Sequence, residues 1–149
     1  PAGIRAEEHQ RTHPTKLGLK WEGIMRYLFI EVPQFMKRRD RYFESDDEFR
    51  AFQAELAADP KSWGAMPGCG GLRKARWGDT RRHKGKRGGM RIIYLVVPVP
   101  SDEQRGLVFL IHVYDKDEKD TLTPEEQRIL KRLADDLTRE VREREEQWI

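Results

Sequence analysis

The chain has 149 residues, a length that suits one domain, and 37% of them are charged. Its 29 Lys and Arg and 26 Asp and Glu give a formal net charge of +3. The single cysteine, Cys69, excludes an internal disulfide and any metal site built from several cysteines. The longest apolar runs are far shorter than the ~18 residues that span a bilayer. We therefore expect a soluble, cytoplasmic protein with no membrane segment.

The first part of the chain divides into an extension and the start of a domain. Residues 1–24 are polar and lack a sustained periodicity, so we expect an N-terminal leader or poorly ordered extension ahead of a domain spanning residues 25–149. Tyr27–Val32 is rich in β-branched and aromatic residues and predicts a strand. Pro33 should end that strand, and the residues from Phe35 to Phe43 can form a short helix.

The middle of the chain predicts one helix and two strands. Ser45 and Glu48 have capping-box spacing, and a helix should run from there until Pro60 stops it. A glycine-rich loop follows. Leu72–Trp77 and Met90–Val97 are predicted strands, joined by the basic, glycine-rich segment Gly78–Gly89.

The last part predicts a further strand and a C-terminal helix. Ser101–Gly106 should be a polar turn and Leu107–Tyr114 a strand. Thr123 begins a second capping box, and the apolar stripe of the helix after it is Leu130, Leu133, Leu137 and Val141. The end from Arg142 to Ile149 is mostly charged and should fray. The expected fold is α+β: a mainly antiparallel sheet of about four strands, two helices before most of it and one after.

The basic residues are concentrated in one segment. Between Arg73 and Arg91 lie nine basic residues and one acid, whereas the rest of the chain carries 20 basic and 25 acidic residues. Such asymmetry is typical of proteins that bind a polyanion, most often nucleic acid. A solubilising basic loop is the alternative interpretation.

Alternation along the predicted strand separates its cations from its apolar residues. Lys74 and Arg76 share one face, while Ala75 and Trp77 share the other. Cations two residues apart on a strand are about 7 Å apart, close to the phosphate spacing of a nucleic-acid strand. Arg91, on the next strand, can add a third cation to the same face. The competing interpretation is an edge strand that carries charges to prevent aggregation.

Three ordered motifs resemble the RelE/HigB toxin superfamily, in particular its HigB-like branch. They are PGCGGLRKARW at 67–77, GKRGGMRIIY at 85–94 and LIHVYDKDEKDTLT at 110–123. The likeness covers about residues 25–141. It implies a small RelE-like fold and a toxin of a type II toxin–antitoxin module. Such toxins cleave mRNA in the ribosomal A site without metal or other cofactor, and the ribose 2′-OH attacks the adjacent phosphate to leave a 2′,3′-cyclic phosphate. The implied partners are mRNA, ribosomal RNA and a cognate HigA-like helix-turn-helix antitoxin.

The resemblance also implies roles for individual residues. The residues that it assigns to the catalytic site are Lys74, Arg76, Arg91, Tyr114 and Lys116. The residues that it assigns to holding the RNA backbone are Arg73, Arg81, Arg82, Lys84, Lys86 and Arg87. Family members carry a catalytic tyrosine near their C-terminus, but the corresponding stretch of this chain, from Asp120 to Thr123, contains no tyrosine. The general base is therefore open, and Lys74 is one candidate.

Two other functions remain alternatives. The chain could be a non-catalytic nucleic-acid-binding module on the same scaffold, or a subunit that uses its basic strip to clasp an acidic antitoxin segment. A histidine on the last predicted strand, His112, is interpreted as a structural or sheet-face residue rather than a catalytic one.

Overall fold

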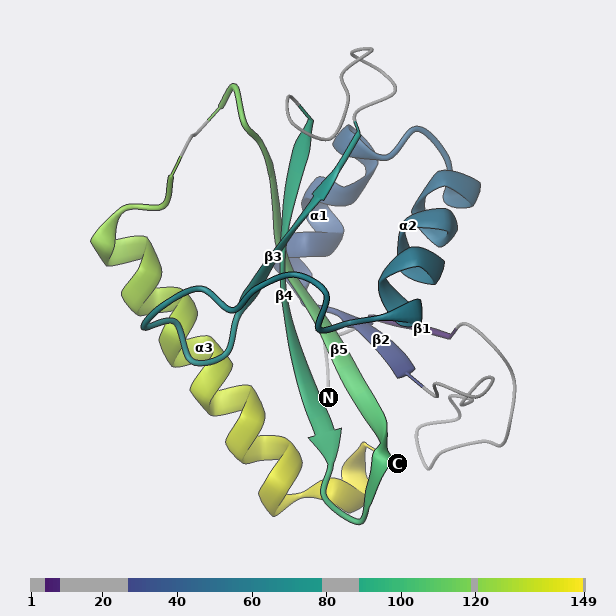
Figure 1. Ribbon diagram of the computed structural model, residues 1–149, viewed down its shortest axis with the longest axis vertical. Helices are drawn as coiled ribbons and strands as arrows, with labels where there is room; N and C mark the ends of the chain where they lie inside the picture. The colour runs from purple at the N-terminus through teal and green to yellow at the C-terminus, as the bar shows by residue number, and fades with distance from the viewer. Residues whose placement is uncertain (1–4, 9–26, 79–88, 119–120, 149) are drawn as a thin grey trace.

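A computed structural model describes residues 5–8, 27–78, 89–118 and 121–148 of the chain (Figure 1). The elements are β1 (Arg5–Glu8), β2 (Tyr27–Glu31), α1 (Pro33–Tyr42), α2 (Asp46–Ala58), β3 (Arg73–Trp77), β4 (Met90–Val99), β5 (Asp102–Asp115) and α3 (Pro124–Glu143), with a short 3-10 helix at Glu145–Gln147. The predicted α+β class and the order of the elements from β2 onward are confirmed.

The strands of the described residues belong to one mixed sheet, in the order β1-β2-β5-β4-β3. β2 runs parallel to β5, and the other neighbouring pairs are antiparallel. The sheet has one more strand than expected because Arg5–Glu8, within the expected N-terminal extension, pairs with β2. β3 and β1 are therefore the two edge strands.

Helices cover both faces of the sheet. Figure 1 shows α1 and α2 on one side of β4 and β5, and α3 on the other. Ring contacts agree with this arrangement, because Phe52 of α2 packs on Trp77 of β3 and Phe109 of β5 packs on Trp148 beyond α3. β4 and β5 lie in the middle, and most of their side chains are buried on both faces, which makes these strands the centre of the core.

The first two helices begin near where the sequence predicts. Pro33 is the first residue of α1, a position where its missing N–H costs nothing and its fixed φ favours the helix. At α2 the Ser45 hydroxyl accepts a hydrogen bond from the Glu48 amide at 3.2 Å. The Glu48 carboxylate accepts from the amide of Glu44 at 2.9 Å, one residue before the predicted partner.

The third helix has the complete capping box predicted for it. The Thr123 hydroxyl accepts from the Glu126 amide at 3.1 Å, and the Glu126 carboxylate accepts from the Thr123 amide at 2.8 Å. The stripe residues Leu130 and Val141 are buried against the sheet. The first turn of α3 is thereby fixed beside the end of β5.

Two local predictions are wrong. Asp102–Gly106 is strand rather than turn, because the β4–β5 ladder continues past the core to a tight turn at Pro100 and Ser101. The polar side chains of Glu103 and Gln104 project into solvent there, which the open end of a hairpin allows. The predicted fraying after Arg142 is also wrong as far as Trp148, since the 3-10 helix turns that indole into the core, where it is 1% exposed.

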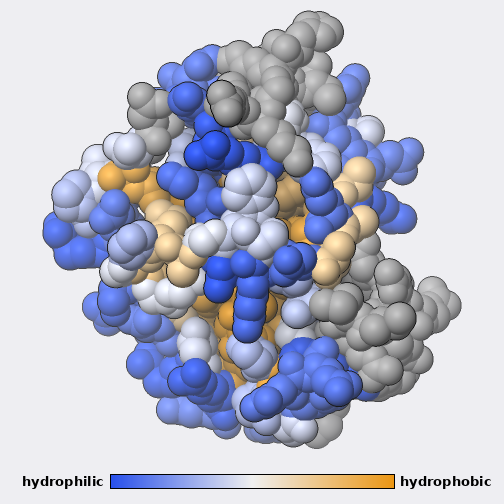
Figure 2. Space-filling view, viewed as in Figure 1, coloured by the Kyte–Doolittle hydropathy of each residue, from blue (hydrophilic) through white to orange (hydrophobic). Residues whose placement is uncertain are grey.

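The surface is dominated by polar and charged side chains, as the composition suggests. In Figure 2 hydrophilic residues cover most of the visible face, and apolar residues show only in small areas between them. Among the described residues, the large hydrophobic side chain that is exposed to solvent is that of Ile129 on α3, with 62% exposure.

Candidate functional site

A row of two arginines and a tyrosine crosses three adjacent strands. Arg76 of β3 lies directly opposite Arg91 of β4, and Arg91 lies opposite Tyr114 of β5. Residues paired in this way project from the same face of a sheet, with Cβ atoms about 4.5–5.5 Å apart. The next row on this face is formed by Lys74, Ile93 and His112. The alternation predicted for Lys74, Arg76 and Arg91 is therefore present.

Exposure decreases along the first row from the edge of the sheet inward. Arg76 is exposed, Arg91 is 7% exposed and Tyr114 is 2% exposed. The Arg91 guanidinium donates to the carbonyl oxygens of Gly89 at 3.3 Å and Met90 at 3.5 Å. These bonds hold the inner cation at the start of β4, whereas the outer cation is accessible at the edge strand.

His112 lies on the same face and stacks on Tyr114. The two rings are 5.7 Å apart between centroids and inclined by 29°. His112 is half-buried and borders a cavity of about 140 Å³ together with Gln34 of α1 and Glu126 of α3. His112 is thus a sheet-face residue, as the sequence predicts. Its spacing of two residues from Tyr114 on one strand is the sequence signal that puts the two rings side by side.

Lys116 follows β5 at the same end of the sheet. Its side chain is exposed, and its amide donates to the carbonyl of Gly89 at 3.3 Å, beside the start of β4. The preceding residue, Asp115, is buried, and its carboxylate accepts from the Asp117 amide at 2.7 Å. The turn after β5 thus presents a cation near the row while turning a carboxylate inward.

This turn is anchored to α1 by a cluster of three side chains. Arg38 donates to the Val113 carbonyl at 2.7 Å, to the Tyr42 hydroxyl at 2.6 Å and to the Glu118 carboxylate at 3.2 Å. The Tyr42 hydroxyl donates to the same carboxylate. Because α1 is held rigidly by the core, the cluster fixes the position of the segment that carries Lys116.

The cluster shifts the titration of two of its members. Burial raises the pKa of Tyr42 to about 12, and the hydrogen bond to Glu118 raises it as well, so the phenol keeps its proton at neutral pH. For Glu118 burial raises the pKa, but hydrogen bonds from Tyr42, from the Asp115 amide and from Arg38 outweigh it. The net pKa of Glu118 is lowered, and this carboxylate is therefore charged at neutral pH.

Arg73 points to the other face of β3 and has structural partners there. Its guanidinium donates to the carbonyl of Trp63 and, at 3.3 Å, to that of Lys61. It is therefore separated from the face that carries Lys74 and Arg76, although the resemblance groups it with the RNA-holding residues. The remaining cations of that group lie outside the described residues: Arg81, Arg82, Lys84, Lys86 and Arg87.

Within residues 5–8, 27–78, 89–118 and 121–148, no group of three His, Cys, Asp or Glu side chains could hold a metal ion. None of the helices in this part of the chain is long and apolar enough to cross a membrane. No protein-family model matches the chain.

Proposed function

We propose that this chain is an endoribonuclease that cleaves mRNA in the ribosomal A site, the toxin of a type II toxin–antitoxin module. The observation that carries the proposal is the row Arg76–Arg91–Tyr114, with Lys74 and His112 in the neighbouring row of the same face. Two guanidinium groups on adjacent strands complement the negative charge of a phosphodiester, and the half-buried ring of His112 offers a surface on which a base can stack.

The proposed reaction requires no group beyond the RNA and these side chains. The 2′-oxygen of the ribose forms a bond to the adjacent phosphorus, and the bond from phosphorus to the 5′-oxygen breaks. The products are a 2′,3′-cyclic phosphate and a 5′-hydroxyl. Negative charge increases on the phosphate oxygens in the transition state, and the role of Arg76 and Arg91 is to stabilise it.

The reaction also moves two protons. A base must accept the proton of the 2′-OH, and an acid must donate one to the leaving 5′-oxygen. The groups that we assign to these steps are Lys74 and His112, in the neighbouring row of the same face, and Tyr114 within the arginine row. Imidazole exchanges protons near neutral pH, which makes His112 suited to either step. Lys116 would contribute a further cation at the end of the site.

The same basic face supplies the expected contacts to other partners. Exposed cations such as Arg76 and Lys116 would bind the backbone of ribosomal RNA. A cognate antitoxin would inactivate the enzyme by covering this face with acidic side chains. Activity on translating ribosomes places the protein in the cytoplasm.

The test combines growth arrest with mapping of cut sites by primer extension in translating ribosomes. The double variant Lys74→Ala/Arg76→Ala should relieve the arrest and remove the cuts, because it removes two of the proposed phosphate-binding and proton-transfer groups. The variant should still fold, because both side chains lie outside the core. Arg50→Ala is a control for the loss of an exposed cation outside this face; it removes a positive charge from α2 and should leave cleavage intact. Full cleavage by the double variant would refute the assigned site. Binding of RNA by the wild type with no cleavage on ribosomes would favour the non-catalytic binding module.

A further inference from the structure

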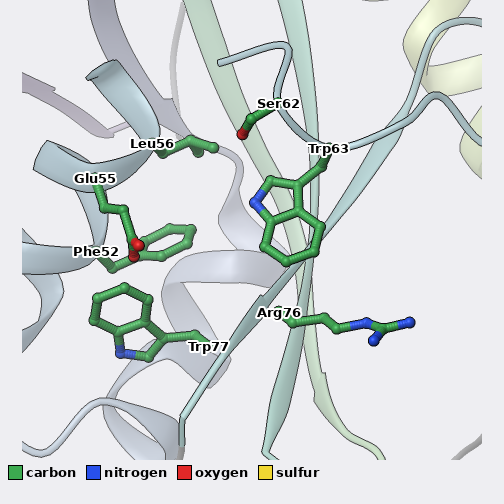
Figure 3. Close-up of a pocket in the computed structure, with 7 residues that line it drawn as sticks. All are labelled: Phe52, Glu55, Leu56, Ser62, Trp63, Arg76 and Trp77. Carbon is green, nitrogen blue, oxygen red and sulfur yellow. The ribbon is translucent and has the colours of Figure 1, made fainter. Parts of the chain in front are cut away.

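A second cavity lies on the opposite side of β3 from the cation row. It has a volume of about 180 Å³ and is bordered by Phe52 and Leu56 of α2, by Trp63 in the following loop, and by Trp77 of β3. In Figure 3 the two indole rings lie at the cavity with the α2 side chains beside them. Both tryptophans are half-buried, so part of each ring remains accessible.

The wall formed by Trp63 is held in place by side chains from two strands. Arg73 of β3 donates to the Trp63 carbonyl, and the hydroxyl of Tyr94, on β4, donates to the carbonyl of Pro60 at 2.6 Å. Burial raises the pKa of Tyr94 to about 12, so this donor keeps its proton at neutral pH. The backbone of the loop is therefore held at Pro60 and at Trp63 before any ligand arrives.

The wall formed by Trp77 is fixed by packing. Its ring meets that of Phe52 edge-to-face, with centroids 5.4 Å apart and planes at 74°. Phe52 is itself 2% exposed and belongs to the core. One side of the cavity is thus a rigid aromatic surface whose geometry does not depend on a flexible side chain.

Two polar side chains, those of Glu55 and Ser62, border the same cavity, and Arg76 lines it at β3. A carboxylate accepts hydrogen bonds from amino and imino groups, and a hydroxyl both donates and accepts, which are the groups found on the edges of nucleobases. Figure 3 shows Arg76 extending away from the aromatic rings, and in the sheet this residue lies opposite Arg91. The cavity and the cation row therefore meet at a single residue.

We propose that this aromatic cavity binds one unpaired nucleobase of a single-stranded RNA whose backbone lies along the cation row. The volume fits a single ring system, because pockets for drug-sized ligands begin at ~300 Å³. The charge also favours a nucleotide over an aromatic side chain of a peptide. Arg76 borders the cavity and belongs to the cation row, so a phosphate bound on that row lies beside the cavity, whereas an aromatic side chain of a peptide brings no such charge. The inference rests on the proposed function only in taking single-stranded RNA as the ligand.

The experiment compares two RNA ligands that carry the same number of phosphates. One is a short single-stranded RNA with 2′-O-methyl groups, which block cleavage, and the other is its abasic counterpart. Affinities are measured by fluorescence anisotropy on the full chain. Stacking of one base on an aromatic ring corresponds to a factor of about 5 to 150 in affinity. The wild type should prefer the base-containing RNA by such a factor.

Substitution of Trp63 should remove this preference without changing affinity for the abasic RNA. Trp63→Ala should lower the ratio toward one, and Trp63→Phe should retain most of it, because the ring is kept. Ile129→Ala is the control, since it truncates an exposed hydrophobic side chain on α3. Trp77→Ala should lower the same ratio, but it removes a side chain of β3 that packs on the core and can unfold the protein. Trp63→Ala tests base binding even in that case, because Trp63 lies in a loop outside the sheet.

Several outcomes would overturn the inference. An unchanged ratio in Trp63→Ala would do so, as would equal binding of both RNAs by the wild type. Loss of binding to an acidic, tryptophan-containing peptide in Trp63→Ala, with the RNA ratio unchanged, would make the cavity a peptide site instead. Failure of ribosomal cleavage with an intact base preference would refute the proposed function and leave the base site standing.

Discussion

Arg76→Ala tests the basic face with little disturbance of the fold. Arg76 is exposed on an edge strand, and its neighbours Ala75 and Trp77, which project from the other face, keep their packing. Surface substitutions of this kind usually change the free energy of unfolding by less than ~0.5 kcal/mol. A change in RNA binding would therefore report on the lost guanidinium.

The expected magnitude follows from the release of counterions. Each phosphate of a single strand that a cation neutralises contributes about −0.7 to the slope of log affinity against log salt concentration. Removing one such contact should reduce the steepness of the slope by about 0.7. When the salt concentration rises fourfold, the factor by which affinity falls should then be about 2.6 times larger for the wild type than for the variant.

The assay is the binding of the 2′-O-methylated RNA across a series of salt concentrations. Arg50→Ala is again the matched control, because it removes the same charge from an exposed position of α2 that does not border the cavity. Its slope should equal that of the wild type. A slope of Arg76→Ala equal to that of the wild type would refute the phosphate contact. An equal reduction in both variants would show that only the net charge matters.

Three further substitutions test the scaffold. The pKa of Glu118 is lowered from its ordinary value of 4.5, so its charged form stabilises the fold above that pH, and this stabilisation is lost as the pH falls through the lowered pKa. Glu118→Gln should therefore make the free energy of unfolding fall less steeply below pH 4.5. An unchanged pH dependence of the unfolding free energy in that range would contradict the cluster with Tyr42. Gly70 has φ +68° and its missing Cβ would lie 2.8 Å from the Asp135 carboxylate, so Gly70→Ala should cost roughly 1–2 kcal/mol in urea unfolding, and a stabilised variant would contradict this conformation. Trp148→Ala removes a side chain that is 1% exposed and should cost about 3–5 kcal/mol, whereas a loss below ~1 kcal/mol would mean that the C-terminal turn is not docked.

The sequence predicts the cation face of β3 because alternation is a local property. Lys74 and Arg76 share a face in any strand that contains both, whatever surrounds it. The match of Arg76 with Arg91 and then with Tyr114 is different, because it depends on the register of three strands. The β4–β5 register also shifts between Ile93 and Tyr94, and no local pattern in the sequence specifies that irregularity.

The aromatic cavity could not be predicted from local patterns at all. Trp63 lies just before a glycine-rich loop, where neither a helical nor a strand period applies. Its position is set by Arg73 and by the Tyr94 hydroxyl, which are ten and 31 residues away in the sequence. Trp148 is a similar case: it follows a charged stretch that suggests fraying, and only its contact with Phe109 reveals that it belongs to the core.

Under the proposed function, one edge strand serves both parts of a nucleotide. A nucleotide carries its phosphate and its base on opposite sides of a sugar, and β3 carries its exposed cation and its aromatic ring on opposite faces at neighbouring positions, Arg76 and Trp77. A single strand of RNA that crosses this edge can therefore present a phosphate to one face and a base to the other. Such an edge must not pair with another strand, and charged side chains discourage that pairing. The arginine that binds the phosphate would thus also keep the edge of the sheet open for the RNA.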